Sequence, residues 1–316
     1  MIVDLGIDAG GSKAAWLAQD DAGATLARGV APAIQAAASE PRLVAEALAA
    51  IVAEAGAQSG APVVALVAGI AGAGVVAVRR AVRDAYARIP GAASPMAIVG
   101  DCEVAAAACL WAGSGVALWS GTGSFCIARG KDGSLQRAGG RGLLLDDRGG
   151  AASIVLAAAR LAVECDDGVH GATALTPALA TAFAVSRARE LGRAMRGLEP
   201  RALAERLPVV LAIAGGGDAA ARGVIAAECD ALASRAVAAV RRAGLAPAGC
   251  EVFLGGGALA HHDALRDALS HALRAKGFDR VPHAGGDAVL GAVRLARALR
   301  RRESPLCTWL EDDRAA

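Results

Sequence analysis

The chain has 316 residues, which is long for one hydrophobic core and comfortable for two domains. Its 33 basic and 31 acidic residues leave a formal charge of +2, so we expect neither a nucleic acid nor a membrane surface as its partner. Without an export pattern or a long uncharged apolar run, we expect a cytoplasmic protein. The seven cysteines are odd in number and lack a Cys-x-x-Cys pair, which argues against disulfides and zinc.

A glycine-rich turn lies near the start of the chain. Alternating residues over Ile2–Ile7 predict a strand that enters the turn Asp8-Ala9-Gly10-Gly11-Ser12-Lys13. Ala14–Ala18 is the expected returning strand, and the hairpin turn Asp20–Gly23 leads to a third strand over Thr25–Gly29.

The same order of elements recurs a third of the way along the chain. Val116–Ser120 enters the turn Gly121-Thr122-Gly123-Ser124, and strands follow over Phe125–Arg129 and Leu135–Ala138. Glycines without a Cβ, together with a hydroxyl, leave main-chain N–H groups open to an approaching phosphate. The repeat therefore predicts two similar halves, and two such turns facing across a cleft suit a nucleoside triphosphate.

Strand and helix patterns alternate through the rest of the first half, which predicts an α/β fold with a mostly parallel sheet. The expected elements there are a helix capped by Ser39 and running to Ala57, a strand over Pro62–Ala68, a helix over Val75–Arg88, a strand over Met96–Gly100 and a helix over Glu103–Trp111. The second half adds helices over Ala151–Glu164 and on to Arg206, a strand or helix end over Val209–Ala214, a long helix from the cap Asp218 to Ala243, a strand over Cys250–Leu254, and helices over Ala258–Ala275 and Ala288–Arg302.

The two turns resemble the phosphate motifs of the actin, hexokinase and Hsp70 ATPase superfamily. Within it, the chain is most similar to the BadF/BadG/BcrA/BcrD ATPase family and its N-acetylglucosamine kinase-like branch, over nearly its whole length. The resemblance implies two actin-like (ribonuclease H-like) domains with a nucleotide cleft between them. We expect the first domain at 1–112, joined by the returning segment 288–316, and the second at 113–287.

Phosphoryl transfer needs bound phosphates, a magnesium ion and a base for the acceptor proton. Asp8 can order Mg²⁺ through water, and Lys13 can neutralise phosphate charge. Asp101 follows an apolar strand at a helix start, and the resembled sugar kinases carry their catalytic base there, so Asp101 is the predicted catalytic base. Asp8 and Asp101 are also the predicted magnesium residues, which hold the ion through water. The predicted ATP contacts are Gly10, Gly11, Ser12, Lys13, Gly121, Thr122 and Gly123, with Gly255, Gly256 and Gly257 resembling the adenosine motif.

The acceptor residues follow from the resemblance alone. The family's Gly-Gly-Trp-Gly and Gly-Asp-Glu-Gly-Ser segment aligns with Gly139–Gly150, so Thr122, Asp147 and Arg148 are the predicted sugar contacts. Several positions depart from the family pattern: Arg141 stands for Trp, Asp146 for Gly, Arg148 for Glu, Gly150 for Ser and Phe125 for Asn, and the loop Val30–Ile34 lacks an expected Asn. The arginines offer planar donors that suit a carboxylate or phosphate on the acceptor.

These predictions indicate an ATP- and Mg²⁺-dependent kinase of an amino sugar, N-acetylglucosamine or a glucosamine-like compound, which we expect to be a homodimer. One alternative is an ATPase that activates a partner enzyme, as in the related dehydratase activators, whose cysteines bridge an iron–sulphur cluster; Cys102 and Cys109 share a helix face. A second is a Rossmann dehydrogenase, because Gly72–Ala77 fits G-x-G-x-x-A after a strand and Asp101 ends the next strand.

Overall fold

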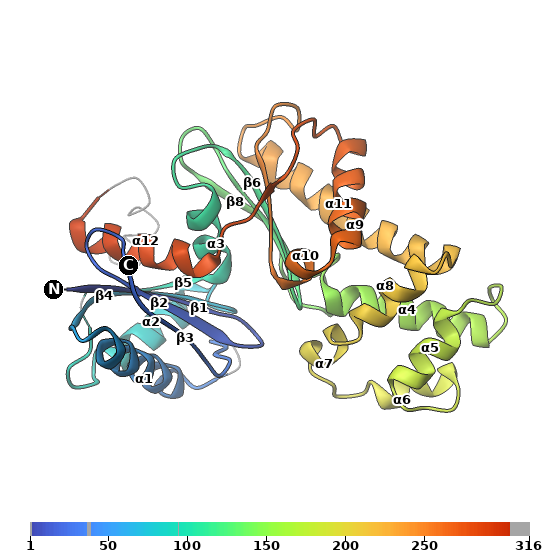
Figure 1. The fold of residues 1–316 in the computed structure, drawn as a ribbon, viewed down its shortest axis with the longest axis horizontal. Helices are drawn as coiled ribbons and strands as arrows, with labels where there is room; N and C mark the ends of the chain where they lie inside the picture. Colours follow the sequence, from blue (N-terminus) through green and yellow to red (C-terminus); the bar gives the residue numbers. More distant parts are fainter. Residues whose placement is uncertain (1, 37–38, 94, 304–316) are drawn as a thin grey trace. The chain divides into compact units, whose positions relative to one another are not determined.

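The computed structural model describes residues 2–36, 39–93 and 95–303 (Figure 1). The chain divides into two compact units, one formed by Met1–Gly113 with Gly285–Ala316 and the other by Ser114–Ala284. Each unit contains a five-stranded sheet and buries its own hydrophobic cluster. The chain therefore has two separate cores, each built around one sheet.

In the first unit, helices cover both faces of the sheet. Helices α1 and α2 lie on one face, and α3 lies with α12 on the other (Figure 1). The elements are β1 (Val3–Ala9), β2 (Ala14–Gln19), β3 (Thr25–Ala31), α1 (Pro41–Ser59), β4 (Val63–Ile70), α2 (Val76–Tyr86), β5 (Met96–Gly100), α3 (Asp101–Cys109) and α12 (Ala288–Arg301). The strand order is β3-β2-β1-β4-β5.

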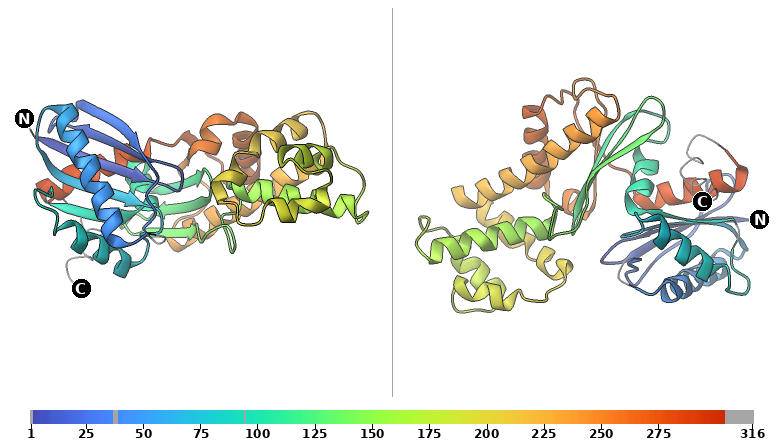
Figure 2. Two further views of the ribbon diagram at one scale, coloured as in Figure 1. Left: turned by 90° about the horizontal axis from the view of Figure 1, so that it is seen from below. Right: turned by 180° about the vertical axis from the view of Figure 1, so that it is seen from behind.

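The second unit has a larger set of helices, most of them inserted between its third and fourth strands. The elements are β6 (Gly115–Ser120), β7 (Ser124–Arg129), β8 (Leu135–Gly139), α4 (Ala151–Asp166), α5 (Leu175–Ala182), the 3₁₀ helix Ala188–Glu190, α6 (Leu191–Ala194), α7 (Pro200–Ala204), α8 (Leu207–Gly215), α9 (Ala219–Arg242), β9 (Val252–Gly255), α10 (Gly257–His261), α11 (Asp263–Ala275) and β10 (His283–Ala284). Figure 2 shows α4 to α8, in light green to yellow, gathered beside the second sheet.

The two sheets share one topology, which confirms the internal repeat. The second sheet has the order β10-β9-β6-β7-β8, so β6, β7, β8, β9 and β10 take the places of β1, β2, β3, β4 and β5. In each sheet the first three strands pair antiparallel and the other pairs are parallel. The prediction of a mostly parallel sheet is therefore wrong, because two short glycine-containing turns in each unit reverse the chain between neighbouring strands.

Several local boundaries differ from the sequence predictions. Ser39 does not cap α1: the helix begins at Pro41 with Glu40 before it, and Pro41 needs no N–H partner in the first turn. The helix expected over Ala258–Ala275 is interrupted at His262, whose extended backbone separates α10 from α11. The cap at Asp218 is confirmed, since its carboxylate accepts a hydrogen bond from the third residue of α9.

Helix α12 returns to the first unit and approaches its backbone closely. A Cβ at Gly291 would overlap the carbonyl oxygen of Val104 in α3, and a Cβ at Gly6 would overlap the backbone of Val293. These glycines let main chain lie against main chain, so α12 fits tightly between β1 and α3.

A buried carboxylate anchors the far end of α12. Asp4 in β1 is 1% exposed and accepts hydrogen bonds from Arg300 at 2.8 and 2.9 Å. Arg297 lies 3.3 Å from the same carboxylate. Because a buried charge without partners is very costly, the two arginines and Asp4 depend on one another.

We expect Asp4→Ala to lower the free energy of unfolding by about 3 kcal/mol, because it removes the one buried carboxylate that faces both the Arg297 and the Arg300 guanidinium groups. Urea unfolding followed by circular dichroism measures the change. The control is Glu46→Ala, which breaks the exposed Arg42–Glu46 pair and should cost less than about 1 kcal/mol. Equal losses in both variants would contradict a special role for Asp4.

Candidate active site

The first unit places Asp8 and Asp101 at the same edge of its sheet. Asp8 pairs in register with Gly69 of β4, which pairs with Val99 of β5, and Asp101 follows β5 at the start of α3. Because neighbouring strands lie about 4.8 Å apart, two strand spacings separate Asp8 from Val99 by about 10 Å, and Asp101 lies two residues beyond Val99. Two carboxylates at this spacing face a region where water and phosphate oxygens can complete the ligands of a magnesium ion.

The pKa of Asp8 is raised to about 7. Burial is the largest cause, and the negative charges of Asp101 and Asp287 add to it, while Lys13 acts in the opposite direction. Asp287 was not found by sequence reasoning; it caps α12, where its carboxylate accepts a hydrogen bond from Val289 N. The sequence signal for this cap is the pair Gly286-Asp287 directly before an apolar helix.

This electrostatic arrangement suits a divalent cation. Burial is the main cause of the raised pKa of Asp8, and a cation among the three carboxylates would relieve the repulsion from Asp101 and Asp287 that adds to it. Within the described residues, no three Asp, Glu, His or Cys side chains converge closely enough to hold a metal directly. The residues therefore fit an ion bound mainly through water and phosphate, as Mg²⁺ commonly is.

Asp101 belongs to the first turn of α3 and is not its cap. Gly100 occupies the cap position, and Asp101 Oδ1 accepts a hydrogen bond from Cys102 N at 2.9 Å. The positive end of the helix favours the ionised carboxylate there. Arg79 of α2 pairs with Glu103 at 2.6 Å, which ties the start of α3 to the neighbouring helix.

The first predicted phosphate turn, which connects β1 and β2, is short and open. Gly10 N donates to Lys13 O at 3.0 Å, and Gly11 and Lys13 are exposed, with Ser12 between them half-buried. A Cβ at Gly11 would come within 3.3 Å of Gln35 Nε2, the far end of a flexible side chain that can shift by a few tenths of an ångström. The arrangement leaves the turn accessible to an anion.

In the second unit, the phosphate turn is bonded to the segment that follows β8. Gly121 N donates to Gly123 O, while Gly121 O and Thr122 O accept from Ala151 N and Ala152 N at 2.9 and 3.1 Å. A Cβ at Gly123 would overlap the carboxylate of Asp147. The structure therefore brings the predicted phosphate and acceptor residues of this unit together.

The glycines of the predicted adenosine motif have different structural roles. Gly256 has a φ of +91°, and a Cβ there would overlap the backbone of Ser120, while Gly255 lies against the indole of Trp119. Gly257 begins α10 and has open space beside it, 3.8 Å from an ideal Cβ at Gly121. The motif thus adjoins the second phosphate turn, and its open position is Gly257.

Asp147 is held in an uncommon backbone conformation. Its φ is +56°, its side chain is half-buried, and Oδ1 accepts a hydrogen bond from Gly142 N at 3.0 Å. Such a conformation in a residue other than glycine often marks a functional position. Arg148 next to it is exposed but pairs through Nε with Glu228 at 2.6 Å, and Arg141 is also exposed.

Phe125 fills the position where the resembled family has Asn. It is 7% exposed, and its ring stacks on Trp119 with centroids 6.2 Å apart and an angle of 8° between the rings. The guanidinium of Arg137 lies 5.9 Å from the centre of the Phe125 ring. An aromatic and cationic stack has therefore replaced a hydrogen-bonding amide at this position.

The two alternative interpretations find little support in these units. Cys102 is 3% exposed, and burial raises the pKa of Cys109, so neither thiol is placed like an exposed cluster ligand. Cys307 lies outside the described residues. The dehydrogenase prediction is wrong, because the antiparallel β1-β2-β3 meander is incompatible with a Rossmann sheet and Gly72–Ala77 is only a tight passage from β4 to α2.

Comparison with known proteins places the chain in a family. Residues 5–296 match the model of the BadF/BadG/BcrA/BcrD ATPase family, and the chain belongs to that family. A search of curated proteins finds no match. Within the part of the chain that the structure describes, the helices are too short or too polar to cross a membrane.

Solved structures share the fold. A candidate N-acetylglucosamine kinase from Chromobacterium violaceum is 24% identical, with a TM-score of 0.74 over 92% of this chain and 98% of its own. Another from Porphyromonas gingivalis is 19% identical, with a TM-score of 0.72 over 96% and 100%. A ROK family glucokinase from Streptomyces griseus, in complex with glucose and AMPPNP, is 18% identical, with a TM-score of 0.57 over 93% and 99%. These likenesses confirm the predicted actin-like α/β fold.

The raised pKa of Asp8 predicts a dependence of stability on pH. The ordinary Asp value is 3.8, so between about pH 4 and pH 7 the folded protein binds a proton that the unfolded chain has lost. Stability from this group therefore falls as the pH rises through that window. We expect the urea midpoint of the wild type to fall more from pH 5 to pH 8 than that of Asp8→Asn.

Magnesium supplies the control for this measurement. At pH 8, Mg²⁺ should raise the midpoint of the wild type more than that of Asp8→Asn, because it binds the folded carboxylates. Parallel pH profiles for the two proteins, with equal responses to Mg²⁺, would show that Asp8 neither titrates near neutrality nor holds the ion.

Proposed function

We propose that the protein is an ATP- and Mg²⁺-dependent kinase that transfers the γ-phosphate of ATP to a hydroxyl of an amino sugar. The observation that carries this proposal is the pair Asp8 and Asp101 at one strand edge, with the pKa of Asp8 raised by burial and by its acidic neighbours. Phosphoryl transfer needs such a pair, with one carboxylate for the metal and one for the acceptor proton.

Each residue has a distinct role in the proposed reaction. Asp101 accepts the proton of the sugar hydroxyl. The sugar oxygen bonds to the γ-phosphorus, and the bond between that phosphorus and the oxygen that leaves with ADP breaks. Asp8 and Asp101 would hold Mg²⁺ through water, and the ion would supply positive charge beside the β- and γ-phosphates. The ATP contacts are those predicted from the two glycine turns and the Gly255–Gly257 motif, and Thr122 and Asp147 are the proposed sugar contacts.

The class of acceptor is supported by the neighbours and refined by the chain's own residues. The names of the similar structures include N-acetylglucosamine kinase, glucokinase and, for a Listeria monocytogenes protein, N-acetylmannosamine kinase. Asp147 offers a carboxylate at the loop, which suits the ammonium of an unacetylated amino sugar. Arg148 is ion-paired with Glu228, so its guanidinium is already engaged by a carboxylate of the chain. The structure therefore supports an acid-bearing sugar less than the sequence did. The cytoplasmic location and the homodimer stay predictions.

We expect Asp101→Asn to lose about 100-fold or more in kcat while ATP still binds, because the amide cannot accept the hydroxyl proton. Coupled assay of ADP release gives kcat, and calorimetry gives ATP affinity. The matched control is Asp267→Asn on the exposed face of α11, which should leave both unchanged. Near-normal turnover in Asp101→Asn would remove Asp101 from the role of base.

The acceptor is tested by ADP release over glucosamine, N-acetylglucosamine, mannosamine and glucose. We expect the highest kcat/KM for glucosamine, because Phe125 removes the amide hydrogen bonds that the family position offers, and unpaired groups change discrimination strongly. A KM for N-acetylglucosamine of about 1 mM or lower, with full turnover, would contradict the preference and support the N-acetylated sugar as substrate.

A further inference from the structure

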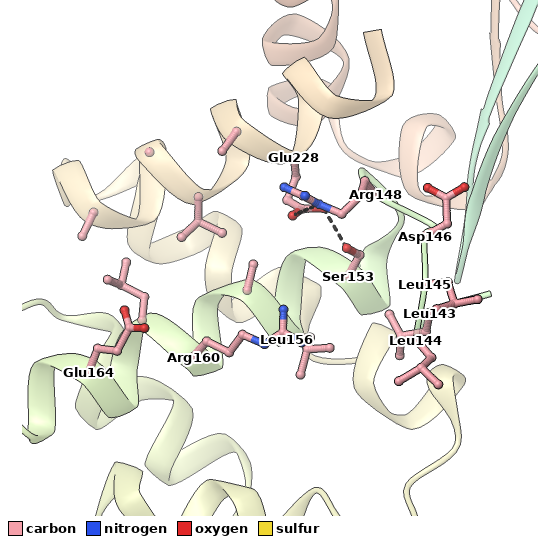
Figure 3. Close-up of a pocket in the computed structure, with 16 residues that line it drawn as sticks. Leu143, Leu144, Leu145, Asp146, Arg148, Ser153, Leu156, Arg160, Glu164 and Glu228 are labelled. Atoms are coloured by element: carbon pink, nitrogen blue, oxygen red, sulfur yellow. Dashed lines mark hydrogen bonds and ion pairs between the residues drawn. The ribbon is translucent and has the colours of Figure 1, made fainter. Parts of the chain in front are cut away.

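The loop that carries Asp147 has little packing to hold it. Leu144 and Leu145 at its tip are 94% and 81% exposed. Behind the loop lies a cavity of about 490 Å³, bounded by the loop, by α4 and by α9 (Figure 3). A loop beside an open cavity can shift without losing close-packed contacts, so something other than side-chain packing must set its position.

Two acidic side chains link the loop to α9. Asp146 on the loop accepts a hydrogen bond from Arg235 Nε of α9 at 2.6 Å, and Glu228 of α9 binds the residues that follow Asp147. The Glu228 side chain is 3% exposed, and its two oxygens accept hydrogen bonds from Arg148 Nε at 2.6 Å, Gly149 N at 2.8 Å and Ser153 Oγ at 2.7 Å. Figure 3 shows Arg148 and Ser153 converging on Glu228 at one end of the cavity. A buried carboxylate with three donors is a strong and directional anchor.

The anchored segment also adjoins the second phosphate turn. Ser120 Oγ donates to Gly149 O, and Ser124 Oγ donates to Arg148 O, both at 2.7 Å. Residues 148–152 are thus hydrogen-bonded to the turn through their main chain, and the same segment is bonded to α9 through Glu228. Asp147 immediately precedes this doubly bonded segment and takes its left-handed conformation there.

The chain has also exchanged charges at this position. The resembled family segment has Glu where this chain has Arg148, and the acidic group here comes from Glu228, 80 residues further along. The Arg148–Glu228 pair thus links α9 to the loop across a long stretch of sequence.

From these contacts we propose that Glu228 is a positioning residue, which fixes Asp147 against the second phosphate turn so that the acceptor sugar is bound in line with the γ-phosphate. Glu228 touches neither substrate nor nucleotide in this role. The inference rests on the proposed function, because it assigns to Glu228 the orientation of the acceptor loop of that same site.

The test compares Glu228→Ala and Glu228→Gln with the wild type, using glucosamine as acceptor. We expect the KM for glucosamine to rise about 10-fold or more in Glu228→Ala, because several hydrogen bonds to a charged group are lost. The KM for ATP should change less than about 3-fold, because four hydrogen bonds still join the loop to the phosphate turn. The KM for glucosamine of Glu228→Gln should lie between those of the wild type and Glu228→Ala, and this variant provides the test if Glu228→Ala does not fold.

Two further variants separate positioning from general stability. Arg148→Gln combined with Glu228→Gln should be less impaired than the product of the single changes, because the neutral side chains can pair. Glu205→Gln weakens two surface ion pairs in the same unit, with Arg201 and Arg206, and should change neither KM.

Hydrogen exchange over residues 142–152 gives a readout that needs no activity. We expect faster exchange in both Glu228 variants and wild-type exchange in Glu205→Gln. Unchanged exchange, or parallel changes of both KM values, would overturn the proposal. If the wild type releases no ADP with any sugar, the proposed function fails, while the exchange result still decides whether Glu228 holds the loop.

Discussion

Electrostatic repulsion among three carboxylates is the constraint on which the candidate site depends. Asp8, Asp101 and Asp287 come from β1, the start of α3 and the cap of α12, and their charges combine with burial to raise the pKa of Asp8. Like charges in a half-buried place separate unless the backbone holds them. The parallel register of β1, β4 and β5 fixes the first two, and the anchoring of α12 fixes the third.

Helix α12 shows how distant parts of the chain supply that restraint. Asp287 caps its N-terminal end, and Arg300 binds its C-terminal end to Asp4. Its middle lies against the main chain of β1 at Gly6, and Gly291 of the helix lies against the main chain of α3. Asp4 and Asp8 lie on the same strand, so one strand carries both the buried anchor and the candidate metal residue. The stability of the helix and the geometry of the site are therefore linked through β1.

The two units have the same sheet topology and different chemistry. The first presents carboxylates at the ends of β1 and β5, whereas the second presents glycines and hydroxyls around the turn after β6. In the second unit, Ser120 and Ser124 donate hydrogen bonds to main-chain carbonyls of the loop after β8. Glu228 of α9 accepts hydrogen bonds from Gly149 N and from the side chains of Arg148 and Ser153. The first unit thus gathers carboxylates at the ends of its strands, and the second unit exposes main chain at a glycine-rich turn.

The sequence by itself determined the two glycine turns, their repetition, most of the helices, the α/β class and Asp101 at a helix start. These features are local: a turn needs particular residues at particular positions, and a helix shows its period in a short window. The tertiary structure alone decided the order of the strands in each sheet, that Asp287 approaches Asp8, and that Arg148 is bonded to Glu228. Strand order, the proximity of charges and long-range ion pairs depend on which segments lie side by side, and no local pattern in the sequence encodes that.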